Sequence, residues 1–201
     1  MNPFGNVPDL LLIVAVIVLI VAAILILASG RKDDDVGGTR AQMRYVGTIG
    51  ILTLFTVLFA FFAVVQALTG FIVDGHSDNA LYRSALDNGL LMLTAGAVFV
   101  FHYQRTAVLA PAGKLARGAT GSTARAALYG VCFVAAIIAL FAAAKAVYGI
   151  FQIIAPGVFG DGSDGDVARE QGIADVLSYA SLTIASVLIF LRSWNWLPEH
   201  R

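Results

Sequence analysis

The sequence is poor in the residues that most catalytic and metal sites require. Its 201 residues include one cysteine and three histidines, and only 13% of them are charged. A soluble domain carries about 25% charged residues, so roughly half of the usual charge is missing. The single cysteine, Cys132, excludes an intrachain disulfide and a cysteine-based zinc cluster. The 13 acidic and 13 basic residues cancel, which leaves no net basic field for binding nucleic acid.

Long apolar runs take the place of the missing charge, and 59% of the residues are hydrophobic. An α-helix rises about 1.5 Å per residue, so crossing a hydrocarbon core of about 30 Å takes roughly 20 apolar residues. Backbone groups in hydrocarbon must be paired within the segment, so each run is predicted to be a helix. The sequence therefore predicts an all-α integral membrane protein with five transmembrane helices. These are Leu10–Ser29, Val46–Val73, Leu86–His102, Ala126–Ile154 and Ala174–Arg192.

The five runs divide the chain into an anchor helix and two helical hairpins. The N-terminal run, in residues 1–30, has no Lys or Arg before it and is long for a signal peptide, so it is predicted to be a retained anchor. A cytoplasmic linker, 31–44, precedes the first hairpin, 45–105, and a cytoplasmic loop, 106–125, precedes the second hairpin and its short tail, 126–201. The hairpins share a tyrosine near the start, an acidic turn and an aromatic end. This favours a parallel duplication that forms a four-helix bundle, although membrane-insertion rules impose similar features on unrelated hairpins.

The basic residues of the loops and ends are distributed very unequally between the two sides of the predicted membrane. Two of them, Arg83 and Arg169, fall on one side and ten fall on the other. Cytoplasmic loops carry the excess of Lys and Arg. The sequence therefore predicts a multi-pass protein of the cell membrane with its N-terminus outside and its C-terminus in the cytoplasm. The ten predicted cytoplasmic residues are Arg31, Lys32, Arg40, Arg44, Arg105, Lys114, Arg117, Arg125, Arg192 and Arg201.

Basic and aromatic residues gather at the predicted cytoplasmic ends of the helices, where side chains meet lipid headgroups. A haem would need two axial ligands at matched depth, and neither His76 nor His200 lies at the depth of His102, so no cofactor is predicted. His102 is instead expected at the interface. The residues expected to contact headgroups are His102, Arg105, Lys114, Arg117, Arg192, Trp194 and Trp196.

One cation, Lys145, lies in the middle of a predicted transmembrane helix. It precedes Pro156 by 11 residues, which places it about 16 Å inside the outer interface. A lysine at that depth costs about 2.5–3.5 kcal/mol, so Lys145 is expected to point into the bundle. Tyr148 and Gln152 lie on the same helix face. This polar stripe is either a structural interhelical contact or a site for an anionic ligand or a proton-coupled step.

Three residues of other predicted helices are candidate partners of Lys145, namely Gln66, Asp87 and Asp175. Both aspartates start their predicted helices, so their expected main role is to stabilise the positive helix N-terminus. No Ser-His-Asp set, His-Glu-x-x-His motif or P-loop occurs, so the chain is not predicted to be an enzyme and no catalytic or metal-binding residue is predicted.

Short motifs at the hairpin ends carry a resemblance to a known family. They are Tyr45 with Phe101–Arg105 and, more weakly, Tyr129 with Arg192–Trp196. Over Arg40–Trp196 the chain resembles an uncharacterised prokaryotic membrane family, domain of unknown function 5671. The resemblance implies a multi-helix membrane domain and no activity. Arg192 stands where a histidine would match the family pattern.

The absence of a catalytic motif favours a non-enzymatic role, most simply an accessory or structural subunit of a membrane complex. A small transporter or channel that uses the Lys145 stripe is the alternative, and a membrane subunit of an oxidoreductase complex is the second alternative. The expected partners are the lipid bilayer and other membrane proteins, or a second copy that associates through small-residue helix faces. Such faces include Ala135, Ala139 and Ala143, which recur at every fourth position. No nucleic-acid partner is expected.

Overall fold

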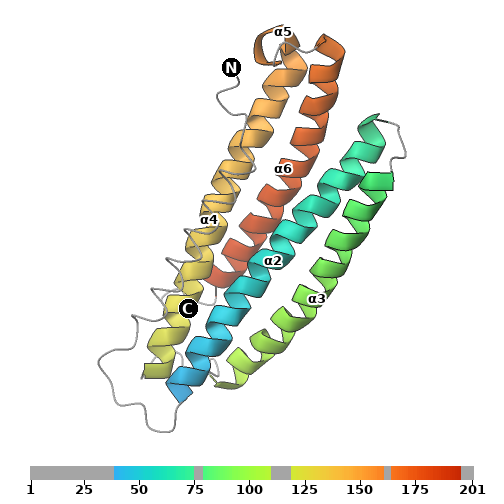
Figure 1. The fold of residues 1–201 in the computed structure, drawn as a ribbon. Coiled ribbons are helices and arrows are strands. Elements are labelled where there is room, and N and C mark those ends of the chain that lie inside the picture. Colours follow the sequence, from blue (N-terminus) through green and yellow to red (C-terminus); the bar gives the residue numbers. More distant parts are fainter. Residues whose placement is uncertain (1–38, 75–78, 110–118, 161–163, 196–201) are drawn as a thin grey trace. The chain divides into compact units, whose positions relative to one another are not determined.

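A computed structural model of the protein describes residues 39–74, 79–109, 119–160 and 164–195 (Figure 1). These residues form four long α-helices and one short helix, and no strand occurs among them. The helices are α2 (Thr39–Asp74), α3 (Asn79–Leu109), α4 (Ala119–Ile154), α5 (Pro156–Phe159) and α6 (Gly165–Trp194). The predicted anchor helix, Leu10–Ser29, lies outside the described residues.

Each long helix contains a stretch that is long and apolar enough to cross a membrane. The stretches are Ala41–Val73, Asn79–Arg105, Ala124–Ile154 and Gly165–Trp194. They have 27 to 33 residues, which exceeds the roughly 20 that a helix needs to span the hydrocarbon core. The described residues are therefore all-helical, as predicted, and four of the five predicted spans fall on helices that are long and apolar enough to cross a membrane. This indicates a multi-pass membrane protein.

The helices α3 and α6 begin several residues before the apolar runs from which they were predicted. They start at Asn79 and Gly165 rather than at Leu86 and Ala174. The added segments are polar but contain good helix formers such as Ala, Leu, Arg, Glu and Gln. The prediction that Asp87 and Asp175 start their helices is therefore wrong, because each lies more than two turns inside its helix. Asp166 is the acidic residue in the first turn of α6.

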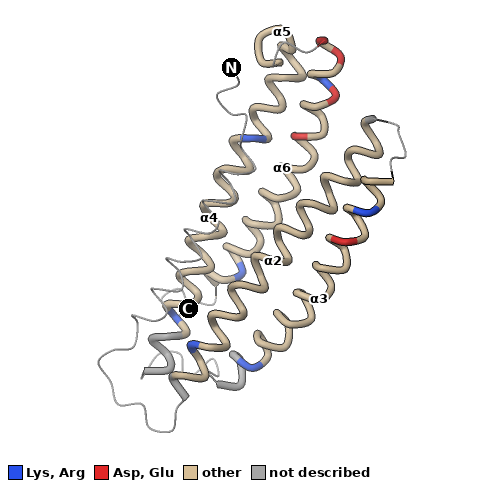
Figure 2. Tube along the Cα trace, in the orientation of Figure 1, with Lys and Arg blue, Asp and Glu red and all other residues tan. Residues whose placement is uncertain are grey.

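The helices pack into two compact units, and each unit contains a part of every long helix. Unit 1 includes the described residues 39–55, 95–109, 119–135 and 189–195, and unit 2 is formed by Thr56–Thr94 and Ala136–Leu188. The charges differ between the units (Figure 2). The described part of unit 1 contains no Asp or Glu and carries arginines on all four helices, Arg44, Arg105, Arg125 and Arg192 among them.

Within unit 1, α2 contacts both α3 and α4. The rings of Tyr45 and His102 lie 5.8 Å apart, and a Cβ atom on Gly47 would lie 3.5 Å from the methyl group of Ala127. The Cys132 thiol lies 3.9 Å from the carbonyl oxygen of Phe190, which joins α4 to α6. Cys132 is thus a buried packing residue, as its apolar surroundings predict.

Within unit 2, α6 contacts both α2 and α4. The rings of Phe62 and Tyr179 lie 5.0 Å apart at the α2–α6 contact. At the α4–α6 contact the two backbones meet, because a Cβ atom on Gly172 would lie 2.8 Å from the carbonyl oxygen of Gly149. Such close approach of small residues is how transmembrane helices gain van der Waals contact. We call this contact the glycine crossing.

Helix α3 is the least buried of the long helices. Among its described residues only Ala95 and His102 are buried, whereas leucines such as Leu90 and Leu93 are mostly exposed. Its ring contact in unit 2 joins Tyr82 to Phe71 of α2 at 4.5 Å. The exposed apolar face of α3 in unit 2 is suited to contact with lipid chains.

Candidate functional site

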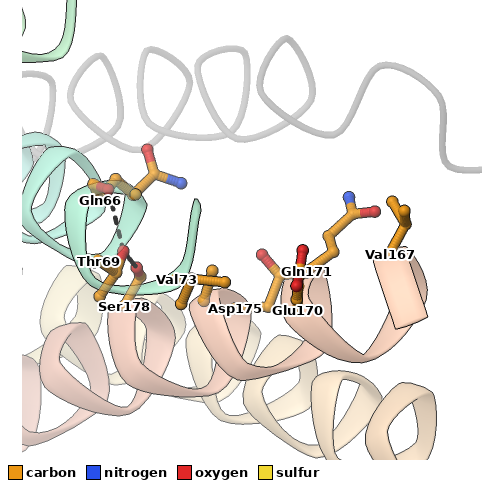
Figure 3. Close-up of a pocket in the computed structure, with 10 residues that line it drawn as sticks. Gln66, Thr69, Val73, Val167, Glu170, Gln171, Asp175 and Ser178 are labelled. Atoms are coloured by element: carbon orange, nitrogen blue, oxygen red, sulfur yellow. Dashed lines mark hydrogen bonds between the residues drawn. The ribbon is translucent and has the colours of Figure 1, made fainter. Parts of the chain in front are cut away.

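A polar groove of about 250 Å³ lies between α2 and α6 in unit 2 (Figure 3). It follows both helices over residues 66–73 and 167–178, and the α6 side is about 16 Å long at helical rise. Six of its ten lining residues have polar side chains. The lining residues are Gln66, Thr69, Gly70 and Val73 of α2 and Val167, Glu170, Gln171, Ala174, Asp175 and Ser178 of α6.

Two hydroxyl groups in the groove lining join the two helices. The Oγ atoms of Thr69 and Ser178 lie 3.1 Å apart, and both residues are buried. The Thr69 hydroxyl donates its single proton to the carbonyl oxygen of Gln66 at 2.9 Å. Ser178 must therefore donate to Thr69, which fixes the direction of this short chain of hydrogen bonds (Figure 3).

The outer wall of the groove carries carboxylates and amides without a basic residue. Gln66, Glu170 and Gln171 are exposed and Asp175 is half-buried. None of these four side chains has a hydrogen bond or ion pair in the described part of the chain. Gln66 lies in the candidate span Ala41–Val73, roughly 10 Å from the Val73 end. The groove thus presents unpaired acceptor groups near one end of this candidate span.

Lys145 is half-buried on α4. Its ammonium group lies 5.6 Å from the centre of the Tyr148 ring. Asp175 contacts α4 one helical turn from Lys145, because a Cβ atom on Gly149 would lie 3.2 Å from the Cβ atom of Asp175. Asp175 therefore lies at the α4–α6 contact and also lines the polar groove.

The other members of the predicted polar site do not line the groove. Tyr148 donates a hydrogen bond of 3.0 Å to the carbonyl oxygen of Phe159 and so ties α4 to α5. Gln152 is 4% exposed at the glycine crossing, where its Oε1 atom has no partner. Asp87 is exposed on α3 and does not line the groove. The structure thus brings together Gln66 and Asp175 in one groove, and neither Lys145 nor Asp87 lines it.

The sequence predicts that His102 faces a lipid headgroup, but the structure shows a buried side chain. It is 8% exposed, and its ring packs against Tyr45. Its Nδ1 atom lies 2.8 Å from the carbonyl oxygen of Val98, which fits an Nδ1–H donor. The expected interface residues Arg105, Arg192 and Trp194 are exposed, and the Arg105 guanidinium lies over the Phe101 ring. Lys114, Arg117 and Trp196 lie outside the described residues.

Four polar lining residues were not predicted as members of a site: Thr69, Ser178, Glu170 and Gln171. A signal for some of them exists in the sequence. Residues 171, 175 and 178 of α6 follow the spacing of one helix face, as do 66 and 69 of α2. Polar residues at this spacing indicate a polar face on each helix, although they do not indicate that the two faces meet.

No protein-family model, curated protein or solved structure significantly matches the chain. Among the described residues, no group of three or more His, Cys, Asp or Glu side chains is placed to hold a metal ion. The functional conclusion therefore rests on the polar groove and on the charges beside it.

Proposed function

We propose that the protein is an accessory or structural subunit of a membrane complex and that the polar groove receives a transmembrane helix of its partner. The observation that carries this proposal is the exposure of Gln66 within a candidate span, beside Gln171 and Asp175. Hydrocarbon offers these groups no hydrogen bonds, so leaving them in lipid is costly. A neighbouring helix supplies the missing partners.

The lining of the groove supports this role in a second way. Gly70 and Ala174 are small, so a neighbouring helix has room to approach closely. Polar groups in such contacts hydrogen-bond across helices and help to fix which helices associate. The exposed face of α3 is mostly leucine, and its exposed Arg83 and Asp87 do not line the groove.

The proposal includes the topology predicted from charge. The arginine-rich ends in unit 1 face the cytoplasm and the acidic segment near Asp166 faces outward. The N-terminal anchor, residues 1–30, adds a fifth crossing that places the N-terminus outside. The duplicated hairpins and membership of the resembling family are further parts of the same proposal.

The proposal is tested by the mass of the particle purified from native membranes in mild detergent. The wild type is expected to run as a stoichiometric complex with another membrane protein. Ala174→Phe fills the groove and is expected to release the partner, whereas Leu90→Phe adds bulk to the exposed face of α3 and is expected to retain it. A wild type that purifies as a lone monomer, or a complex that survives Ala174→Phe, contradicts the proposal.

A second candidate function is transport, because Lys145 and Asp175 place opposite charges inside candidate spans and Asp175 opens on the groove. Ionisable residues at such depth commonly mark ion or substrate pathways. In this alternative, a solute in the groove competes with Lys145 for the Asp175 carboxylate. Flux through reconstituted vesicles separates the two functions, as argued for Lys145 in the Discussion.

A further inference from the structure

We infer that the helix received by the polar groove belongs to a different protein and carries a lysine or arginine at the depth of Asp175. This inference rests on the proposed function and names the chemistry of the partner. Three features of the groove support it: the charge of its lining, its elongated form and the composition of this chain's own helices.

The charge of the lining favours a cation. Two carboxylates, Glu170 and Asp175, line the groove and no Lys, Arg or His does. The remaining polar groups are amides and hydroxyls, which also accept hydrogen bonds from an ammonium or guanidinium group. Lys145 is not part of the lining and forms no ion pair with Asp175. The side of the Asp175 carboxylate that faces the groove therefore has acceptor positions for a second cation.

The form of the groove favours a side chain presented by a helix. The groove follows α2 and α6 and has its length along their axes, and the small residues Gly70 and Ala174 lie in its lining. A volume of about 250 Å³ accommodates one or two side chains of a neighbouring helix rather than the helix itself. A basic side chain entering from the bilayer would be stabilised by Asp175, because opposite charges attract strongly away from water.

Neither the predicted anchor helix of this chain nor a symmetrically docked second copy supplies that cation. The predicted anchor helix, Leu10–Ser29, contains no Lys, Arg or His. A second copy that docked symmetrically would place its own groove opposite, and two sets of carboxylates would then face each other. Like charges at that distance repel, so the complementary surface belongs to another protein.

The test uses two designed transmembrane helices in phosphatidylcholine vesicles that contain the full-length protein. One is a leucine-alanine helix with a single lysine about 15 Å from its outer end, which matches the ten residues between Gly165 and Asp175. The other has leucine in place of that lysine. Energy transfer from the labelled protein to each helix measures binding. We expect the lysine helix to bind about tenfold more tightly than the leucine helix.

Variants of the acidic residues identify which carboxylate causes the preference for the lysine helix. Asp175→Asn is expected to remove the preference for the lysine helix, whereas Asp87→Asn, which neutralises an exposed aspartate of α3, is expected to keep it. Glu170 is exposed, so Glu170→Gln does not depend on the folding of the interior. It is expected to weaken binding of a third helix whose lysine lies one turn nearer the outer end.

Several results would overturn the inference. Equal binding of the leucine helix would assign the groove to an apolar segment such as Leu10–Ser29. If two labelled copies of the protein show energy transfer, and Ala174→Phe abolishes it, the groove binds a second copy of this chain. If Ala174→Phe releases the native partner but Asp175→Asn retains it, the proposed function is supported and the inference of a basic partner helix is wrong. If the native protein purifies as a monomer and the groove still binds the lysine helix more tightly than the leucine helix, the proposed function is wrong.

Discussion

Replacing Gly172 with alanine is expected to lower the free energy of unfolding by about 1–3 kcal/mol, the usual cost of overpacking a contact. The new Cβ atom would lie 2.8 Å from the carbonyl oxygen of Gly149 and close to the side chains of Ile153 and Gln152. A backbone oxygen cannot turn away as a side chain does, so α4 and α6 must separate. Thermal unfolding of the purified protein, followed by circular dichroism in detergent, measures the effect.

The control is Gly89→Ala on α3. Nothing lies within 4 Å of a Cβ atom at Gly89, so the substitution adds no clash. Alanine is the better helix former by about 1 kcal/mol, so Gly89→Ala is expected to leave stability unchanged or to raise it slightly. A Gly172→Ala protein as stable as the Gly89→Ala protein would show that α4 and α6 do not meet at the glycine crossing.

Replacing Lys145 with methionine is expected to lower stability by at most about 1 kcal/mol. The reason is that Asp175, which contacts α4 one helical turn away at Gly149, loses a nearby positive charge. Asp175→Asn alone is expected to lower stability by a similar amount, because the ammonium group of Lys145 loses a nearby negative charge. The double variant carries neither charge, so it is expected to be more stable than the sum of the two single effects predicts. Chemical unfolding of the four proteins measures this coupling, and strictly additive effects would show that the two charges do not interact.

The same variant separates structural support from transport. If the charges serve structure, Lys145→Met leaves proton and potassium fluxes into reconstituted vesicles equal to those of the wild type. If they serve a pathway, a flux seen with the wild type disappears in Lys145→Met while the stability changes little. Leu90→Phe, on the exposed face of α3, controls for nonspecific effects of substitution on reconstitution.

The transmembrane helices could be predicted because their signal is a length, set by the thickness of hydrocarbon and the rise of a helix. The same count predicts the depth of Lys145, and the cost of a charge in lipid predicts its inward direction. The first turns of α3 and α6 gave no such signal. Their polar residues are compatible with a loop or with a helix, so Arg83, Arg169 and Glu170 were assigned to loops but lie on helices.

The groove could not be predicted because it depends on which helices are neighbours. Hairpin connectivity predicts that α2 packs against α3, as the rings of Phe71 and Tyr82 do. The hydrogen bond between Thr69 and Ser178 requires in addition that α2 pack against α6, which is distant in sequence. A helix that is apolar on most of its faces gives little indication of which face turns toward a neighbour. The buried position of His102 was not predicted for the same reason.

Cysteine labelling across the membrane tests most directly the claim that these helices cross a bilayer. In a Cys132→Ala background, Asp164→Cys precedes α6 and Arg117→Cys precedes α4. We expect a membrane-impermeant maleimide to label position 164 in intact cells and to label position 117 only after the membrane is permeabilised. Labelling of both positions from the same side would contradict the crossing of α4 and with it the proposed topology.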